Sequence, residues 1–411
     1  MSNSRSHADL SGQRWDMLRS REGGTEVSTL ELFFDLVYVF AISQLSHLLL
    51  DHLTLRGALE TAILLFAVWW LWMYTTWATN WFDPKKIGVR LVIITIMGLG
   101  LLMSTALPHA FEDRGLWFAA IYVAIQVGRS LFFAIGLGSN RQAKNFWRIT
   151  AWMVYAAPFW IAGGLCEGDT RLALWLIAVA IDALGPLTRY PTPSLGRSKF
   201  DEWDISGEHM AERAQLFMII CLGESILMTG NTLAKIDHIT AMVIAAFVVS
   251  FATSVLMYWN YFSRSGRAAE IFEHHDNPGA LGRAYTYFHI PMVAGIIALA
   301  VSDELVIAHP DGHVSTELAA VAIGGGALYF FGNAIFNATI TSAFPRRRTI
   351  ALLGVLTAIP FAHLVSPLVL MIWVMMPFLI LAIVDGNTKP PPYIDAHKQV
   401  SDDDDVAIDG S

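Results

Sequence analysis

Charged residues are scarce in this 411-residue sequence. Asp, Glu, Lys and Arg make up 15% of it, whereas hydrophobic residues make up 55%. Soluble domains carry about a quarter of charged residues, because they must cover their surface with polar groups. So little charge excludes an ordinary soluble fold, and we expect a protein whose main partner is the lipid bilayer.

Cysteine and clustered positive charge are scarce as well. Cys166 and Cys221, the two cysteines, fall inside apolar segments, which indicates packing and no disulfide or metal site. The net charge of -8, with an acidic run from Asp402 to Asp405, argues against nucleic-acid binding, which needs a basic face. No nucleotide-binding loop or nucleophile elbow occurs in a supporting context, so we expect no cofactor and no metal.

Long apolar runs are abundant. A bilayer core needs roughly 20 apolar helical residues to cross it, and the runs are too long for the strands of a membrane barrel. We therefore predict an all-α polytopic membrane protein with about twelve transmembrane helices, near residues 29–50, 57–79, 88–107, 115–136, 146–165, 170–190, 209–230, 239–262, 281–302, 316–338, 348–366 and 367–385.

Lys and Arg outside these runs fall almost entirely on one side of the predicted membrane, which marks that side as cytoplasmic. Residues 1–27 are polar and lack the apolar core of a signal peptide, so we expect a cytoplasmic tail there and a multi-pass protein of the cell (inner) membrane. Both ends are then cytoplasmic. The opposite loops carry only Arg56, Arg114, Arg171 and Lys235.

The two halves of the chain show weak internal similarity. Asn80-Trp81-Phe82 recurs as Asn260-Tyr261-Phe262, and the same offset places Gln44 onto Glu224. The consistent order of such matches favours a six-plus-six duplication whose halves share one orientation, as in one class of secondary transporters. The predicted organisation is an N-terminal tail (1–27), a first half (28–190), a cytoplasmic linker (191–207), a second half (208–385) and an acidic, disordered cytoplasmic tail (386–411).

Ionisable residues within the first span form a polar stripe. A charge at the centre of a span costs about 2.5–3.5 kcal/mol, so such residues usually face the bundle interior and mark function. Glu31 and Asp35 lie one turn apart, and Gln44 and His47 lie on another face nearer the opposite end. Glu31 has an alternative role, because Ser28 and Glu31 fit a helix capping box.

The seventh span carries the richest set of ionisable residues. His209, Arg213 and Glu224 share one face at three depths, and Glu212 lies beside Arg213. His209 and Glu212 have the spacing of a metal-ligand pair, but di-iron sites need further carboxylates and histidines from facing helices. A structural role for both at the helix start is equally open.

Three further spans contribute isolated ionisable residues. Arg129 in the fourth span needs an anion, and we expect Asp35, Glu212 or Glu224 to pair with it. Asp182 in the sixth span and His289 in the ninth complete the set.

Two stretches resemble the signatures of the bacterial low temperature requirement A (LtrA) family. They are Glu31-Leu-Phe-Phe-Asp35 with Gln44-Leu-Ser-His47, and His209-Met-Ala-Glu212-Arg213 with Leu222-Gly223-Glu224-Ser225. Tyr287-Phe288-His289 is similar to a third stretch, while Met210 stands where the family pattern leads us to expect an aromatic residue. The resemblance covers nearly the whole chain and implies a multi-span bacterial membrane protein linked by name to growth in the cold, without implying a substrate, cofactor or catalytic residue.

Three functions remain open from the sequence. The first is a secondary transporter or proton- or ion-conducting protein for an unknown small ion or lipid-like substrate, with Asp35, Glu224 and Arg129 near a cavity between the halves. The second is an intramembrane enzyme acting on a lipid or isoprenoid, with His209, Glu212 and Glu224 as acid and base. The third is a passive scaffold, although several deep charges would then be costly without purpose.

The charge distribution makes a prediction about topology. A cysteine replacing Lys85 should resist an impermeant thiol reagent in intact cells, because that loop is expected to face the cytoplasm. A cysteine replacing Arg114, in an opposite loop, should react with the same reagent. The reverse labelling pattern would overturn the predicted orientation.

Overall fold

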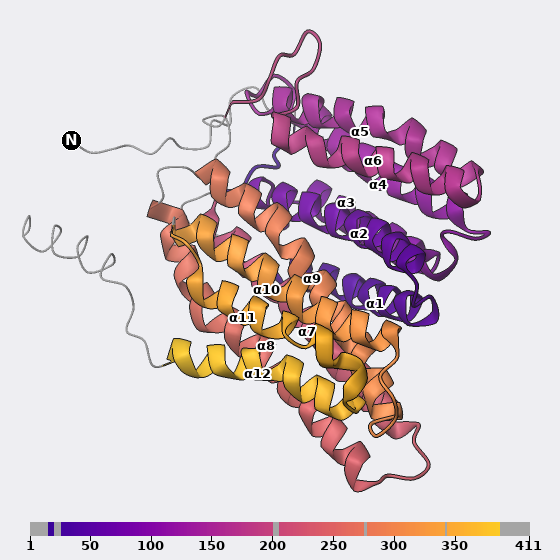
Figure 1. The fold of residues 1–411 in the computed structure, drawn as a ribbon. Coiled ribbons are helices and arrows are strands. Elements are labelled where there is room, and N and C mark those ends of the chain that lie inside the picture. The colour runs from indigo at the N-terminus through magenta and orange to yellow at the C-terminus, as the bar shows by residue number, and fades with distance from the viewer. Residues whose placement is uncertain (1–14, 20–25, 200–204, 275–277, 342, 387–411) are drawn as a thin grey trace, which may run out of the picture.

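The chain folds into a bundle of α-helices with no strand in its described part (Figure 1). The computed structural model describes residues 15–19, 26–199, 205–274, 278–341 and 343–386, without the side chains of 264–281. The helices are α1 (Thr29–Asp51), α2 (Leu55–Trp81), α3 (Ile87–Ser104), η1 (Leu107–His109), α4 (Gly115–Leu137), α5 (Ala143–Leu165), α6 (Gly168–Thr188), α7 (Gly207–Ala234), α8 (Ala241–His274), α9 (Pro278–Ala308), α10 (Thr316–Thr341), α11 (Arg346–Leu356), η3 (Ile359–Leu364) and α12 (Pro367–Gly386).

The predicted all-α polytopic membrane fold is confirmed. Within the described ranges, 10 helices have the length and apolar character needed to cross a membrane. The two remaining α-helices are α5 and α11. Helix α5 is long enough, with 23 residues, but carries Lys144, Asn145 and Arg148 in its first turns.

The span predicted at 348–366 is interrupted. Helix α11 has 11 residues and ends at Leu356, and a short 3-10 helix, η3, follows with Pro360 in its first turn. Proline has no backbone N–H and a fixed φ, so it cannot continue an α-helix through this point. The predicted span is therefore divided into two short helices.

The same helix pairs pack together in each half of the chain. Helix α1 contacts α2 and α3 as α7 contacts α8 and α9, and the chain of contacts from α3 through α6 recurs from α9 through α12. Figure 1 shows the first-half helices above and the second-half helices below, with α1 and α2 meeting α7 and α9 between them. A six-plus-six duplication stays a prediction that accounts for this agreement.

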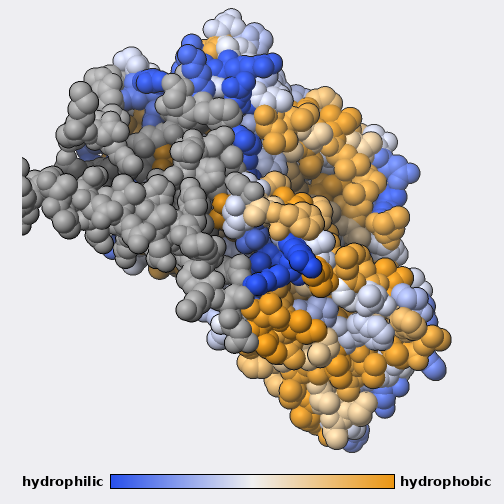
Figure 2. All heavy atoms as spheres, turned by 60° about the vertical axis from the view of Figure 1, so that its left-hand side comes forward, coloured by the Kyte–Doolittle hydropathy of each residue, from blue (hydrophilic) through white to orange (hydrophobic). Residues whose placement is uncertain are grey.

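The outside of the bundle is apolar. Large hydrophobic residues on α8 are exposed at helical spacing, among them Ile244, Val248, Phe251 and Val255. Figure 2 shows broad hydrophobic areas on the visible side of the bundle. In a membrane protein such faces contact lipid acyl chains, which confirms the bilayer as a partner.

Part of the predicted N-terminal tail is packed against the bundle. The backbone of Met17 accepts a hydrogen bond from Asp83 N at 2.9 Å, and Arg19 N donates to Trp81 O at 2.8 Å. Met17 and Leu18 are buried at 2% and 8% exposure, so residues 15–19 belong to the folded protein. The rest of the predicted N-terminal tail up to residue 25, and the predicted C-terminal tail beyond Gly386 with Asp402 to Asp405, lie outside the described residues.

Helices α9 and α10 approach each other closely at glycine. A Cβ atom added to Gly295 would lie 2.6 Å from both Gly325 O and Tyr329 N, which are backbone atoms of α10. Small residues permit such contacts between membrane helices, where van der Waals packing is a main source of stability.

We expect Gly295→Ala to destabilise the protein, because backbone atoms of α10 cannot move aside as a flexible side chain can. Overpacking of this kind costs about 1–3 kcal/mol. Gly324→Ala is the matched control, since nothing lies within 4 Å of a Cβ at that position. Thermal unfolding of the purified protein in detergent should separate the two variants, and equal melting temperatures would contradict the close α9–α10 packing.

Candidate functional site

Helices α1 and α7 lie side by side and run in the same direction. Glu31 contacts His209, Asp35 contacts Arg213 and Ser43 contacts Glu224. The residue numbers of the contacting pairs therefore increase in the same direction along both helices. These helices are the first of each predicted half. Their contact brings together residues that are about 180 positions apart, which agrees with the predicted duplication.

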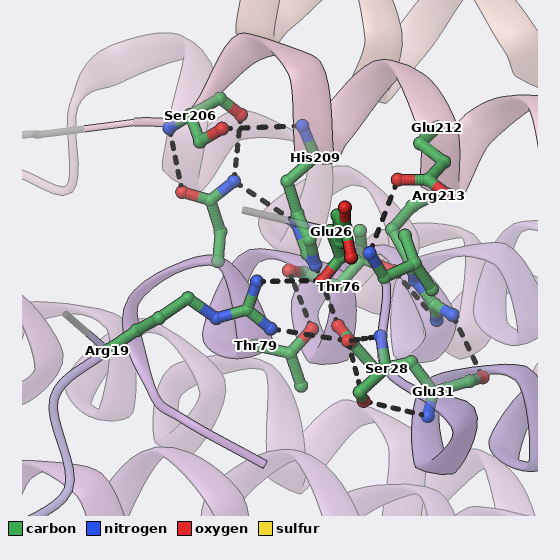
Figure 3. Close-up of polar contacts among 12 residues, drawn as sticks. Arg19, Glu26, Ser28, Glu31, Thr76, Thr79, Ser206, His209, Glu212 and Arg213 are labelled. Carbon is green, nitrogen blue, oxygen red and sulfur yellow. Dashed lines mark hydrogen bonds and ion pairs between the residues drawn. The ribbon is translucent and has the colours of Figure 1, made fainter. Parts of the chain in front are cut away.

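Glu31 connects the N-terminal segment that carries Arg19 with α1 and α7 (Figure 3). Its Oε1 lies 2.8 Å from His209 Nε2, and its Oε2 accepts hydrogen bonds from Ser28 N and Ser28 Oγ at 2.9 Å. The same oxygen lies 3.3 Å from a guanidinium nitrogen of Arg19. Glu31 therefore forms the predicted capping box and also a buried ion pair, so its capping role and its place in the cluster coexist.

Asp35 and Arg213 form a bidentate ion pair inside the bundle. Arg213 NH1 lies 2.7 Å from Asp35 Oδ2, and Arg213 NH2 lies 2.8 Å from Asp35 Oδ1. Trp72 Nε1 of α2 donates to Asp35 Oδ1 at 2.8 Å, and Arg213 NH1 also donates to Glu31 O at 2.9 Å. Two parallel charge-assisted hydrogen bonds are among the strongest polar contacts in proteins, so this pair fixes α1 against α7.

His209 is held on its other side by α2. Its Nδ1 lies 3.2 Å from Asn80 Nδ2, and Asn80 exchanges hydrogen bonds with the backbone of Ser206 at 2.9 and 3.0 Å. Ser206 also caps the start of α7. Glu212 points elsewhere and accepts a hydrogen bond from Val27 N at 3.2 Å, so the sequence pair His209 and Glu212 does not converge on one metal site.

Glu224 forms a separate contact deeper along the same two helices. It is 3% exposed and accepts a short hydrogen bond from Ser43 Oγ. His47 is exposed and close enough to interact electrostatically with Glu224, whereas Gln44 is half-buried. The predicted residues of the two helices thus divide into a charged cluster at the helix starts and a Glu224–Ser43 contact farther in.

Arg129 does not bind the carboxylates expected for it. Its NH1 donates to Leu71 O at 3.2 Å and to Thr75 Oγ1 at 3.0 Å, and its NH2 donates to Gln126 Oε1. The expectation of a partner among Asp35, Glu212 and Glu224 is wrong for the described structure, because each of those carboxylates is engaged with other groups.

Arg129 is linked to a different carboxylate through neutral side chains. Gln126 Nε2 donates to Tyr122 OH at 3.0 Å, and Tyr122 OH donates to Asp182 Oδ2 at 3.0 Å. Trp160 Nε1 donates to the same Asp182 oxygen at 2.9 Å. The carboxylate of α6 and the guanidinium of α4 are therefore connected by a continuous hydrogen-bond chain.

His289 lies apart from the charged cluster. Its Nε2 is 2.9 Å from Tyr261 OH, and its ring stacks on Tyr285 with centroids 5.3 Å apart. The ring is fully buried among aromatic residues of α8, α9 and α10. This environment resembles a packed core position.

Asp303 is a buried carboxylate that the sequence analysis missed. It lies at 0% exposure, and Ser225 Oγ donates to its Oδ2 at 3.3 Å. Ser225 also lies 2.8 Å from Ser254 Oγ, so α7, α8 and α9 meet here. The predicted span ended at residue 302, which placed Asp303 in a loop, whereas α9 continues to Ala308.

A possible metal-binding geometry occurs at the surface. In the described ranges, His109, Glu112 and Asp113 form a group of three that could hold an ion, and all three are exposed. His109 Nδ1 lies 2.8 Å from Glu112 Oε2, and exposed groups of this kind are common without a metal.

Comparison with known proteins places the chain in a family. The family described as bacterial low temperature requirement A protein (LtrA) matches residues 26–384. The chain belongs to the LtrA family. An uncharacterized protein of Rhizobium meliloti (strain 1021) is 42% identical to this LtrA-family chain over 313 residues, which cover 75% of this chain and 76% of the relative. No solved structure matches it.

The two LtrA-like stretches contact each other in the fold. Glu31 and Asp35 come from one stretch, and His209 and Arg213 come from the other. Residues outside both stretches complete the cluster, namely Arg19, Trp72, Thr76 and Asn80. A polar stripe of Thr and Asn along the second predicted span was the signal that could have identified the α2 members.

The Asp35–Arg213 pair makes a prediction about stability. Arg213→Met should destabilise this LtrA-family protein by about 3–5 kcal/mol, because it leaves Asp35 charged and buried without its cation. The double variant Asp35→Asn with Arg213→Met should be closer to wild type, since it leaves no unpaired charge. Thermal unfolding in detergent measures both.

Arg56→Met serves as the control for this experiment. Arg56 also pairs with carboxylates, Glu60 and Asp169, but its side chain is 49% exposed. Exposed pairs contribute little to stability, so we expect no measurable shift. A double variant as unstable as Arg213→Met would show that the ion pair itself is not the source of the stabilisation.

Proposed function

We propose that this protein is a secondary transporter of the cell membrane whose two six-helix halves meet along α1 and α7. The observation that supports this most is the parallel α1–α7 contact, which is built from buried charges. Parallel-repeat transporters place substrate and ion sites near such an interface between halves. Buried ionisable groups in membrane proteins typically belong to ion or substrate pathways.

The contact contains a fixed part and an exchangeable part. Asp35 and Arg213 form a bidentate pair, which resists rearrangement because separation would leave two buried charges. Glu224 has a hydroxyl partner in Ser43. In the proposed cycle, Glu224 exchanges a proton or small cation as the halves move.

An intramembrane enzyme is the second candidate. This candidate gives acid and base roles to His209, Glu212 and Glu224, none of which lines the described cavity that borders α2, α4, α5, α6 and α9. His209 is fully buried between Glu31 and Asn80. Because an acid or base must reach its substrate, the enclosure of His209 argues against such a role for it.

Transport can be tested without knowing the substrate. Purified protein is reconstituted into sealed liposomes loaded with a bacterial small-molecule extract, and the solutes retained after dilution are measured by mass spectrometry. A pH-sensitive dye in parallel vesicles reports proton movement under an imposed potential. We expect wild-type vesicles to lose specific solutes or move protons faster than protein-free vesicles.

Glu224→Gln is the matched variant, because it keeps the side-chain size and removes the charge. We expect it to fold and to lose ion-coupled movement. Wild-type vesicles that behave like protein-free vesicles would contradict transport. A change in the mass of the vesicle lipids in that experiment would instead support the enzyme.

A further inference from the structure

A cavity opens between the first-half helices and α9. Its volume is about 970 Å³ when the open space at its mouth is counted, and it is lined by residues of α2, α4, α5, α6, α9 and the segment between α6 and α7. Its walls are largely aromatic, with Tyr74, Trp77, Trp81, Tyr190 and Tyr287 among them. Pockets that combine apolar, aromatic walls with a few polar groups are typical of sites for small organic molecules.

The charged residues that the structure describes in the cavity lining are Arg129, Arg189, Lys199 and Arg283. Arg129 lies in the interior and is 3% exposed, while Arg189 and Arg283 are half-buried and Lys199 is exposed. The lining described contains no Asp or Glu. The buried positive charge of Arg129 favours an anion over a cation beside it.

Arg129 has donors left for a ligand. A guanidinium has five N–H donors and keeps its charge in proteins. In the described structure Arg129 makes three hydrogen bonds, to Leu71 O, Thr75 Oγ1 and Gln126 Oε1, all neutral acceptors. An anion in the cavity would be its direct counter-charge, whereas Asp182 reaches it only through Gln126 and Tyr122.

The aromatic walls supply a surface for an apolar ligand body. Tyr74 OH and Tyr190 OH lie 2.7 Å apart, and Trp77 Nε1 donates to Thr286 Oγ1 at 3.3 Å, so these rings are held in place. Burial raises the pKa of the Tyr190 phenol, so this hydroxyl stays neutral. Fixed aromatic rings bind flat or hydrocarbon groups at a low cost in side-chain entropy.

We propose that this cavity binds an amphiphilic organic anion, with its carboxylate or phosphate on Arg129 and its aromatic or hydrocarbon body against the Trp and Tyr walls. Arg189, Lys199 and Arg283 add positive charge to the same lining. Binding of this anion does not depend on the proposed function. Its identity as the transported substrate rests on that function. The same chemistry occurs in soluble aromatic or short-chain acids and in anionic phospholipids.

Binding of a soluble acid is tested with 4-phenylbutyrate by equilibrium dialysis of the purified protein, with the neutral 4-phenylbutyramide as matched ligand. We expect saturable binding of the acid and at least tenfold weaker binding of the amide. Arg129→Gln should weaken binding of the acid about 10–100-fold, which corresponds to loss of a charge-assisted hydrogen bond.

Two further variants keep the test decisive if Arg129→Gln does not fold. Arg283→Gln at the mouth should weaken acid binding severalfold at low salt, and the effect should shrink as salt rises. Arg56→Gln removes an exposed arginine at the opposite end of α2 from Trp77 and Trp81, and should leave binding unchanged.

The lipid source is tested by extracting lipids that remain bound after purification from vesicles of mixed phosphatidylglycerol and phosphatidylethanolamine. Selective retention of phosphatidylglycerol by wild type, and its loss in Arg283→Gln, would identify the anion as a lipid head group. Equal binding of acid and amide, with no selective lipid retention, would overturn the proposal. Binding without solute movement would contradict transport alone, and solute movement without binding would remove this cavity as the site.

Discussion

The charge on Arg213 constrains the centre of the structure. A guanidinium cannot lose its proton in a protein, so a buried one requires an anion and acceptors for its donors. Asp35 supplies the anion from α1, Glu31 O supplies a further acceptor, and Trp72 of α2 holds Asp35 in place. Satisfying one cation therefore fixes the relative positions of α1, α2 and α7, and with them the meeting of the two halves.

Helix α2 separates two regions with different chemistry. Trp72, Thr76 and Asn80 face the charged cluster, whereas Tyr74, Trp77 and Trp81 line the cavity. The backbone of Leu71 and the hydroxyl of Thr75 bind Arg129 at the cavity. A shift of α2 would disturb both regions together, which gives the proposed transport cycle a physical connection between the paired charges and the ligand cavity.

The helices were predictable from sequence, because apolar length and helical spacing are local properties, and the α1–α7 meeting was expected from the internal similarity of the two halves. Glu31, Asp35, His209 and Arg213 stood out for the same reason. Their pairing was not predictable: Arg129 was expected to take one of the nearby carboxylates, but Arg213 lies at the level of Asp35 on the adjacent helix. Arg19 and Asp303 were missed because one lies before the first span and the other beyond the predicted end of the ninth.

The buried carboxylates differ in how their charge is balanced, and this difference matters for the proposed cycle. Asp35 has a permanent cation beside it, so its charge is fixed by the fold. Asp182 is bound by Tyr122 and Trp160, and Asp303 by Ser225, which are neutral donors. Neutral donors leave the charge of a carboxylate open to change by a proton or a small cation. Such groups occur in each half away from the rigid pair, namely Asp182 in the first and Asp303 and Glu224 in the second. The charge that joins the halves therefore need not be the charge that changes during transport.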